Sequence, residues 1–370
     1  MPRITLHNVT KQWGKFIGVN NLNLEIEDGS FITLLGSSGC GKTTTLRMIA
    51  GLETPTRGEI RFDDKLMFSS EKNINVPAAK REVGFLFQNY ALWPHMTVYQ
   101  NIAFGLETLK WKKNDIHARV AEMLKTLKIE QFAERYPAEL SGGQQQRVAI
   151  ARTLAPKPRV LFMDEPLSNL DAKLRGEMRT ELKRLHKDMG STFVYVTHDQ
   201  LEAMTLSTKI CLMNEGVLQQ YAPPLTVYNE PANLFVADFV GNPAMNIIEA
   251  TARKLAANTA EIDFLGHKGI FKADNAFDLK SDKISLGIRP EFLPISDAGN
   301  LEGLAYSTLP AGMETTVKIK IASDILSSVV FGAIDYETDA KIRFSIAGSG
   351  ILLFDRSSGL LVAKGSISIQ

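Results

Sequence analysis

Short apolar runs alternate with helix-like segments through the first 235 residues. Five runs are rich in β-branched and aromatic residues and are typical of strands, at 3–9, 31–35, 83–87, 159–163 and 192–196. Several are hydrophobic almost throughout, and helix-like segments separate some of them. The pattern therefore favours an α/β fold with a largely parallel sheet covered on both faces over a sandwich.

Two amphipathic helices are predicted from apolar residues that recur at three- and four-residue steps. The first runs from Asp171, which can cap its start, to Met189, and Gly190 supplies a left-handed stop. The second covers about 116–127, with Asn114 as a possible cap.

The pattern changes after about residue 235. Alternation of apolar and polar residues takes over, as at 316–321 and 341–346, which predicts strands with one buried face. A chain of 370 residues also exceeds one ordinary core. We therefore expect an α/β domain at 1–235 and a β-rich domain at 236–370, with the Pro-containing stretch 221–231 as the approach to the boundary.

Composition excludes several classes of protein. Lys and Arg number 42 against 41 Asp and Glu, which argues against a broad nucleic-acid-binding surface. No apolar run approaches the roughly 18 residues of a membrane helix, and the start of the chain lacks the apolar stretch of a signal peptide. Only two cysteines, Cys40 and Cys211, are present, which suits a reducing compartment such as the cytosol.

A phosphate-binding loop is the most specific chemical motif. It follows the predicted strand 31–35, precedes a short helix that ends near Gly51, and comprises Gly36, Ser37, Ser38, Gly39, Cys40, Gly41, Lys42 and Thr43. Glycines allow successive backbone N–H groups to face phosphate oxygens, and the helix N-terminus adds its positive dipole end. We expect Lys42 to neutralise the outer phosphates and Thr43 to ligate Mg²⁺. A Gly-rich turn without a ligand is the alternative.

Two adjacent carboxylates follow the apolar strand 159–163. The C-terminal edge of an open α/β sheet is where ligands bind, and Asp164 and Glu165 are expected at that edge. Asp164 would hold Mg²⁺, largely through water, and Glu165 would act as a general base on an attacking water. Standing alone, the pair would be interpreted as an exposed acidic turn.

A second Gly-rich turn, Ser141-Gly142-Gly143-Gln144, precedes a helix-compatible run. Its backbone N–H groups form another donor nest at a helix N-terminus. Taken alone, the turn is interpreted as an ordinary helix cap. Its position between the phosphate loop and the acidic strand favours a role at a terminal phosphate.

Together these motifs resemble the ATP-hydrolysing subunits of ATP-binding cassette (ABC) transporters, and among them the maltose-type subunits that energise bacterial sugar import. The resemblance is dense over residues 3–246 and thin beyond. It implies a P-loop ABC ATPase domain with a helical insertion at about 89–158, followed by a regulatory domain resembling an oligosaccharide-binding-type (TOBE) barrel. ATP and Mg²⁺ are the implied cofactors.

The resemblance also implies roles for isolated residues. Trp13 matches the aromatic residue that stacks on adenine, Gln88 the residue that reaches Mg²⁺ and the attacking water, and His198 the switch histidine at the γ-phosphate. Asp171 matches a loop that connects two sites across a dimer, and Thr44 joins the nucleotide-binding set. Alone, each of the first three would be an ordinary core or surface residue.

Partners follow from the same resemblance. Two chains would sandwich two ATP molecules, each between the phosphate loop of one chain and residues 141–144 of the other. Two membrane permease subunits and, indirectly, an extracytoplasmic solute-binding protein complete the importer, at the cytoplasmic face of the cell membrane; no nucleic acid is expected. Polyamine, ferric iron and sulfate remain alternative cargoes. A P-loop phosphotransferase and a cassette protein of DNA repair or translation are less favoured alternatives.

Some residues depart from the family pattern. Ser37 and Thr43 stand where Pro and Ser are usual, and both preserve the chemistry. Gln145 replaces a common Arg, which removes a positive charge near the partner's phosphates, and Phe292 stands where His often follows the RPE triplet. For the apolar segment 89–96, docking of the membrane subunits and simple burial remain equal alternatives.

Overall fold

The computed structural model describes residues 2–369 and divides the chain into two compact units, Met1–Pro224 and Leu225–Gln370. The division falls earlier in the chain than the expected 235/236 boundary. Residues between the two positions form the short helices α7 (Pro224–Asn229) and α8 (Leu234–Phe239). The side chain of Arg289 in the second unit donates hydrogen bonds to the backbone of both, at Tyr228 O and Ala237 O, which explains why they pack there.

The first unit is built on a six-stranded sheet. Its order is β11 (Val217–Ala222), β10 (Lys209–Asn214), β3 (Phe31–Leu35), β9 (Thr192–Val196), β8 (Val160–Asp164), β7 (Val83–Leu86). All neighbouring pairs from β10 to β7 are parallel, and β11 adds one antiparallel edge. Every residue of β3, β8 and β9 is buried, as their continuous hydrophobicity predicted.

The strand expected at 3–9 is present but does not belong to this sheet. It is the first part of β1 (Ile4–Trp13), which pairs antiparallel with β2 (Phe16–Ile26) and β4 (Arg57–Phe62). The second sheet is completed by β5 (Lys65–Ser69) and β6 (Ile74–Asn75). Buried Ile4, Leu6 and Val9 are separated by more exposed residues, the pattern of a sheet with one buried face.

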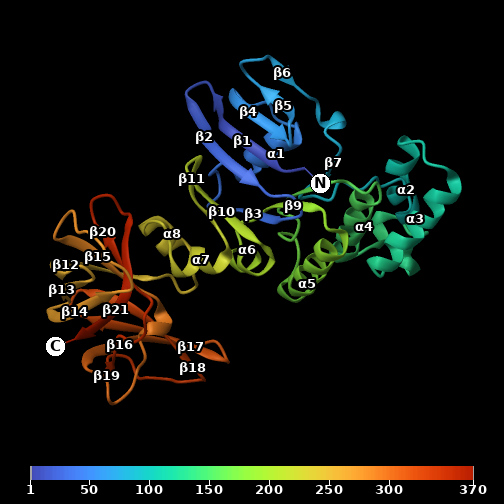
Figure 1. Cartoon of the computed structure of the whole chain (residues 1–370). Coiled ribbons are helices and arrows are strands. Elements are labelled where there is room, and N and C mark those ends of the chain that lie inside the picture. The colour runs from blue at the N-terminus through green and yellow to red at the C-terminus, as the bar shows by residue number, and fades with distance from the viewer. Residues whose placement is uncertain (1, 370) are drawn as a thin grey trace. The chain divides into compact units, whose positions relative to one another are not determined.

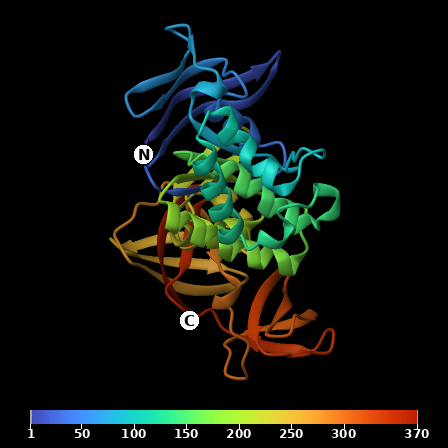
Figure 2. The ribbon, with the colours of Figure 1, turned by 90° about the vertical axis from the view of Figure 1, so that its right-hand side faces the viewer.

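A helical group lies beside the β7 edge of the parallel sheet (Figure 1). It comprises α2 (Val98–Thr108), α3 (Lys113–Thr126) and α4 (Gly142–Leu154), with 3₁₀ turns at Glu130–Phe132 and Pro137–Glu139. Figure 2 views this group from its outer side. The helix predicted at 116–127 begins earlier, because Ile116 N already bonds to Lys112 O. Asn114 therefore lies within the first turn, and the expectation that it caps the helix was wrong.

Three further helices each follow a strand of the parallel sheet: α1 (Lys42–Ala50) follows β3, α5 (Ala172–Met189) follows β8 and α6 (Gln200–Leu206) follows β9. The α5 prediction is confirmed at both ends. Asp171 Oδ1 accepts a hydrogen bond from Leu174 N at 3.0 Å, and Gly190 adopts the left-handed conformation at φ 63°. Gly51 likewise ends α1.

The second unit is β-rich, as predicted. Six strands form a closed barrel, in the order β12 (Asn246–Ala256), β13 (Thr259–Phe264), β14 (His267–Ala273), β21 (Leu361–Ile369), β20 (Ile351–Asp355), β15 (Lys283–Ile288). A separate sheet has the order β18 (Asp324–Phe331), β17 (Glu314–Ile321), β16 (Leu301–Pro310), β19 (Lys341–Phe344). A single apolar core spans barrel and sheet.

Candidate nucleotide site

The phosphate loop joins β3 to α1 and is closed around its own lysine. Lys42 is 5% exposed, and its Nζ donates to the carbonyl oxygens of Gly36 and Ser37, both at 2.8 Å. Gly41 has φ 100°, and a Cβ there would lie 2.4 Å from Gly18 O. The loop therefore needs glycine at this position and holds a positive charge beneath its backbone.

Asp164, the last residue of β8, lies beside the start of α1. Its Oδ1 accepts a hydrogen bond from Thr43 Oγ1 at 2.8 Å, and Arg47 Nη2 lies 3.3 Å from Oδ2. A hydroxyl oxygen and a carboxylate oxygen in contact match the hard oxygen ligands that Mg²⁺ prefers. The donor chemistry therefore fits the predicted metal, with Thr43 and Asp164 on the protein side.

Glu165 and His198 follow the ends of the neighbouring strands β8 and β9. Glu165 Oε2 lies 3.2 Å from His198 Nδ1, and Glu165 N donates to Val196 O. Because parallel strands end at the same sheet edge, two residues far apart in sequence meet there. The structure brings both predicted catalytic residues together.

Gln88 is tied to the loop that follows Glu165. Its Nε2 lies 3.4 Å from Ser168 Oγ, and its carbonyl oxygen accepts a hydrogen bond from Asn169 Nδ2. Ser168 Oγ also donates to Glu165 O at 2.9 Å. Gln88 therefore reaches Glu165 through Ser168, a residue to which the sequence assigned no separate role.

A cavity of about 390 Å³ is lined by Trp13 and by the part of the phosphate loop from Ser38 to Thr44, except Cys40; Gly36 and Ser37 do not line it. Trp13, 43% exposed, stacks on Phe16 with ring centroids 6.2 Å apart, and a Cβ at Gly18 would lie 2.4 Å from the Trp13 ring. Sequence reasoning missed Phe16 and Gly18; their only signal was proximity to Trp13 across a tight turn. The cavity is lined by Trp13, Phe16, Gly18, Ser38, Gly39, Gly41, Lys42, Thr43, Thr44 and Glu165.

The Ser141–Gln144 turn does not line this cavity. Ser141 caps α4: its Oγ accepts from Gln144 N, and its N–H donates to Gln144 Oε1. A Cβ at Gly143 would lie 2.3 Å from Leu174 of α5, so glycine permits close packing of these two helices. Asp171, at the start of α5, is also outside the cavity lining.

Gln145 turns back onto the preceding 3₁₀ segment. Its Nε2 donates to Pro137 O at 3.0 Å and Leu140 O at 3.2 Å. The side chain thus supports the turn that carries Ser141 instead of extending from it. Gln145, which stands where the family commonly has Arg, therefore has a structural role in this turn.

The segment 89–96 is partly buried and partly exposed. Tyr90 is buried in the core of the helical group, whereas Pro94 and His95 are exposed. Trp93 contacts Phe104 at a 4.3 Å centroid separation, and the guanidinium of Arg152 lies 4.8 Å from the Trp93 ring. Burial therefore applies to Tyr90, and docking of the membrane subunits at the exposed residues stays a prediction.

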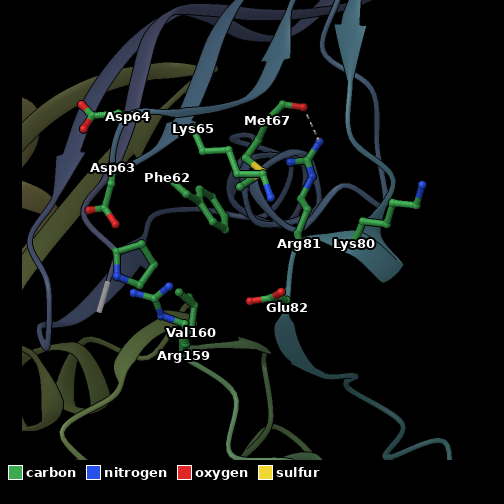
Figure 3. A pocket seen from close by; sticks show the side chains of 11 residues that line it. Phe62, Asp63, Asp64, Lys65, Met67, Lys80, Arg81, Glu82, Arg159 and Val160 are labelled. Carbon is green, nitrogen blue, oxygen red and sulfur yellow. Dashed lines mark hydrogen bonds between the residues drawn. The ribbon is translucent and has the colours of Figure 1, made fainter. Parts of the chain in front are cut away.

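A second cavity, of about 300 Å³, lies at the opposite, N-terminal ends of β7 and β8 (Figure 3). Its central cation, Arg81, donates hydrogen bonds to the carbonyl oxygens of Met48, Ile49, Val76 and Met67. Burial lowers the pKa of Arg81 to about 10. Because these bonds hold the end of α1, Arg81 has a structural role. The lining is Pro2, Phe62, Asp63, Asp64, Lys65, Met67, Lys80, Arg81, Glu82, Arg159 and Val160, which includes no predicted site residue.

Between residues 2 and 369, no helix is long and apolar enough to cross a membrane. This finding agrees with the absence of long apolar runs in the sequence.

Comparisons with known proteins agree with the geometry. The family described as "ABC transporter" matches residues 19–168. The trehalose/maltose import ATP-binding protein MalK of Thermococcus litoralis is 48% identical over 299 residues, 79% of either chain. The osmoprotective compounds uptake ATP-binding protein GgtA of a Synechocystis species is 43% identical over 340 residues, 86% of this chain and 91% of that protein.

A solved structure similar to this chain is a dimer. The dimeric ATP-binding cassette MJ0796, in a post-hydrolysis state bound to ADP and Pi, aligns with a TM-score of 0.52 and 34% identity. The alignment covers 60% of this chain and 98% of that one.

Proposed function

We propose, from the premise that this chain belongs to the ABC transporter family, that it is the ATP-hydrolysing subunit of an importer for a carbohydrate. The observation that carries the proposal is the composition of the 390 Å³ cavity. It joins an aromatic platform, a buried lysine under a glycine loop, and Glu165 on one surface. The aromatic platform suits adenine, the lysine and glycine loop suit the phosphates, and Glu165 suits an attacking water.

Nucleotide binding would use residues at both ends of the cavity. The Trp13 ring offers an exposed face for an adenine base, and Lys11 Nζ lies 5.1 Å from its centroid. At the other end, Lys42 would exchange its two carbonyl partners for phosphate oxygens, which are stronger acceptors because they are charged. Residues Ser38 to Thr44 supply backbone donors and the N-terminus of α1.

Residues at the C-terminal edge of the parallel sheet would carry out hydrolysis. Thr43, Asp164 and Gln88 are proposed to hold Mg²⁺, which would neutralise charge on the phosphates. Glu165 accepts a proton from the attacking water, and His198 holds Glu165 through its contact at 3.2 Å. Ser168 aligns Gln88 with this pair.

The complete site is proposed to require a second copy of the chain. Ser141, Gly142, Gly143, Gln144 and Asp171 lie outside the cavity of their own chain, and a two-fold dimer would bring them to the partner's phosphate loop. The dimeric cassette MJ0796 supports this arrangement.

Carbohydrate is the proposed cargo because a relative that is 48% identical imports trehalose and maltose. Permease subunits would form the pathway, docked against exposed residues of the segment 89–96, and a solute-binding protein would deliver the solute. This chain would lie at the cytoplasmic face of the membrane. The relative named for osmoprotective compounds keeps a non-sugar or modified-sugar cargo as the second candidate.

Reconstituted transport tests the proposal. The chain, coexpressed with candidate permease and binding-protein subunits, is placed in proteoliposomes with ATP inside. Labelled trehalose or maltose is expected to accumulate, and glycine betaine, an osmoprotective compound that is not a sugar, serves as the competing cargo. Accumulation of glycine betaine alone would reject the carbohydrate assignment, and failure of the chain to hydrolyse ATP in the complex would reject the function itself.

Lys42→Ala is expected to raise the dissociation constant for ATP by at least about tenfold, since it deletes a charge-assisted contact to the outer phosphates. Isothermal titration with non-hydrolysable ATP measures the change. Lys65→Ala is the control, because Lys65 lines the cavity at the opposite edge of the sheet. Equal affinities for wild type and Lys42→Ala would remove Lys42 from the phosphate-binding role.

Deletion of residues 225–370 is expected to preserve ATP binding. The first unit contains its own apolar cores and the whole nucleotide cavity. We propose that the second unit supports the dimer in the absence of nucleotide and receives regulatory signals. Sedimentation without nucleotide is therefore expected to show a dimer for the full chain and a monomer for residues 1–224; dimers for both would contradict this role of the second unit.

A further inference from the structure

A partly buried ionic network occupies the start of α5, beside the predicted catalytic residues. Its centre is Arg175, one helical turn after Asp171. Arg175 Nη2 donates to Leu170 O at 3.1 Å, and Nη1 donates to Asp199 Oδ2 at 3.4 Å. One guanidinium therefore contacts the residue before Asp171 and the residue after His198.

Glu202 of α6 forms the second part of the network. It is 3% exposed, and its Oε2 accepts hydrogen bonds from Tyr195 Oη and Thr197 Oγ1, both at 2.7 Å. Arg175 Nε lies 3.8 Å from Glu202 Oε1 and has no hydrogen-bond partner within the described residues. Glu202 thus holds the chain just before His198, while Arg175 holds it just after.

We propose that Arg175 is a positioning residue that couples the loop of Asp171 to the loop of His198. The inference rests on the proposed function, which assigns these loops to opposite nucleotide sites of a dimer. When Asp171 moves at one site, the adjacent Leu170 would shift the guanidinium of Arg175, and Arg175 would in turn shift Asp199. His198, and through it Glu165, would then adjust at the other site.

The network favours arginine over lysine for a geometric reason. A planar guanidinium presents donors in several fixed directions and can contact Leu170 O, Asp199 and Glu202 together, whereas an ammonium is a point charge. Removal of Arg175 would also leave the buried Glu202 without its nearby positive charge. We therefore expect both loops to become more mobile when Arg175 is replaced.

Loop mobility gives the first test, which needs no catalysis. In the full chain, Arg175→Gln is expected to speed amide hydrogen exchange at 169–171 and at 198–199, and Arg175→Lys to have a smaller effect. Arg184→Gln is the matched control: Arg184 lies on the same helix, is 82% exposed at its side chain, and pairs only at 3.7 Å with Asp188. Faster exchange in just one of the two loops would refute the coupling.

Steady-state kinetics give the second test. Arg175→Gln is expected to lower kcat by at least about tenfold and to leave the ATP dissociation constant within about twofold, because Arg175 does not line the nucleotide cavity. Arg184→Gln keeps both values. A lowered melting temperature with an unchanged kcat at temperatures where the chain is folded would leave Arg175 only a structural role and would overturn the proposal.

Mixed dimers separate the two directions of coupling. One chain is intact at Lys42 and the other carries Lys42→Ala, so a single productive site remains. Arg175→Gln is then placed on the intact chain, which supplies His198 to that site, or on the Lys42→Ala chain, which supplies Asp171. Slower turnover in both arrangements is expected, and slower turnover in only one overturns the coupling. Lack of ATP turnover by wild type would refute the proposed function, while the exchange measurement still decides the coupling.

Discussion

Glu165→Gln is expected to slow ATP hydrolysis by about 10²- to 10⁴-fold, the contribution of a positioned general base. The substitution keeps the size of a side chain that lines the nucleotide cavity. It removes the carboxylate that accepts a proton from water, and the new amide can still contact His198. ATP affinity should therefore change little, and the ATP-bound closed dimer should persist.

Single-turnover hydrolysis with labelled ATP measures the chemical step, and sedimentation with ATP and Mg²⁺ measures the dimer. Glu122→Gln serves as the control, since Glu122 pairs with Arg119 on α3 in the helical group and is exposed. Near-normal hydrolysis by Glu165→Gln would remove Glu165 from the base role. A variant that binds ATP but remains monomeric would contradict the sandwich.

The chemical motifs could be predicted from sequence because each is a short, contiguous stretch. Residues 36–43 have one loop geometry compatible with their glycines, and the buried strand 160–164 can only end at a sheet edge. The meeting of Glu165 with His198 also follows from parallel pairing of two strands whose hydrophobicity is continuous.

Long-range packing could not be predicted in the same way. The residue types of the first strand suit either sheet, and only its pairing with 57–62 decides which sheet it joins. Phe16 and Gly18 complete the Trp13 platform through a hairpin, and Ser168 reaches Gln88 across 80 positions. Apart from the closeness of Phe16 and Gly18 to Trp13 in the chain, the sequence contains no signal for these contacts, since they depend on how separate elements pack.

The Ser141–Gln144 turn stands apart from the nucleotide cavity of its own chain, and its predicted contact with a phosphate stays a prediction. Within one chain, Ser141 and Gln144 form the capping hydrogen bonds at the start of α4. No residue of the turn lines the nucleotide cavity. A helix N-terminus whose Ser-Gly-Gly turn is constrained by packing against Leu174 is a rigid surface, suited to contact with another chain. The hypothesis that each nucleotide site is shared between two chains can be tested directly by mixing variants.

Mixing chains that carry Ser141→Arg with chains that carry Lys42→Ala is expected to restore ATP hydrolysis. Each homodimer is inactive, because Ser141→Arg places a long charged side chain at the dimer contact and Lys42→Ala lacks a phosphate ligand. The mixed dimer has one site in which both defects meet and one in which the loop and the opposing turn are intact. Random pairing makes half of the dimers mixed, so activity can reach about one quarter of wild type.

Ser141→Ala separates blocking of the contact from loss of the α4 cap. Removing a Ser N-cap costs about 1 kcal/mol, so Ser141→Ala should lower stability modestly, and because it deletes only a hydroxyl it should reduce ATPase activity less than Ser141→Arg does. The rate on mixing is measured against the two variants assayed alone, with tagged chains purified in sequence to isolate the mixed dimer. If the site were complete within one chain, mixing would add no activity to the sum of the two variants, and the position of Ser141 outside its own cavity would reflect a capping role alone.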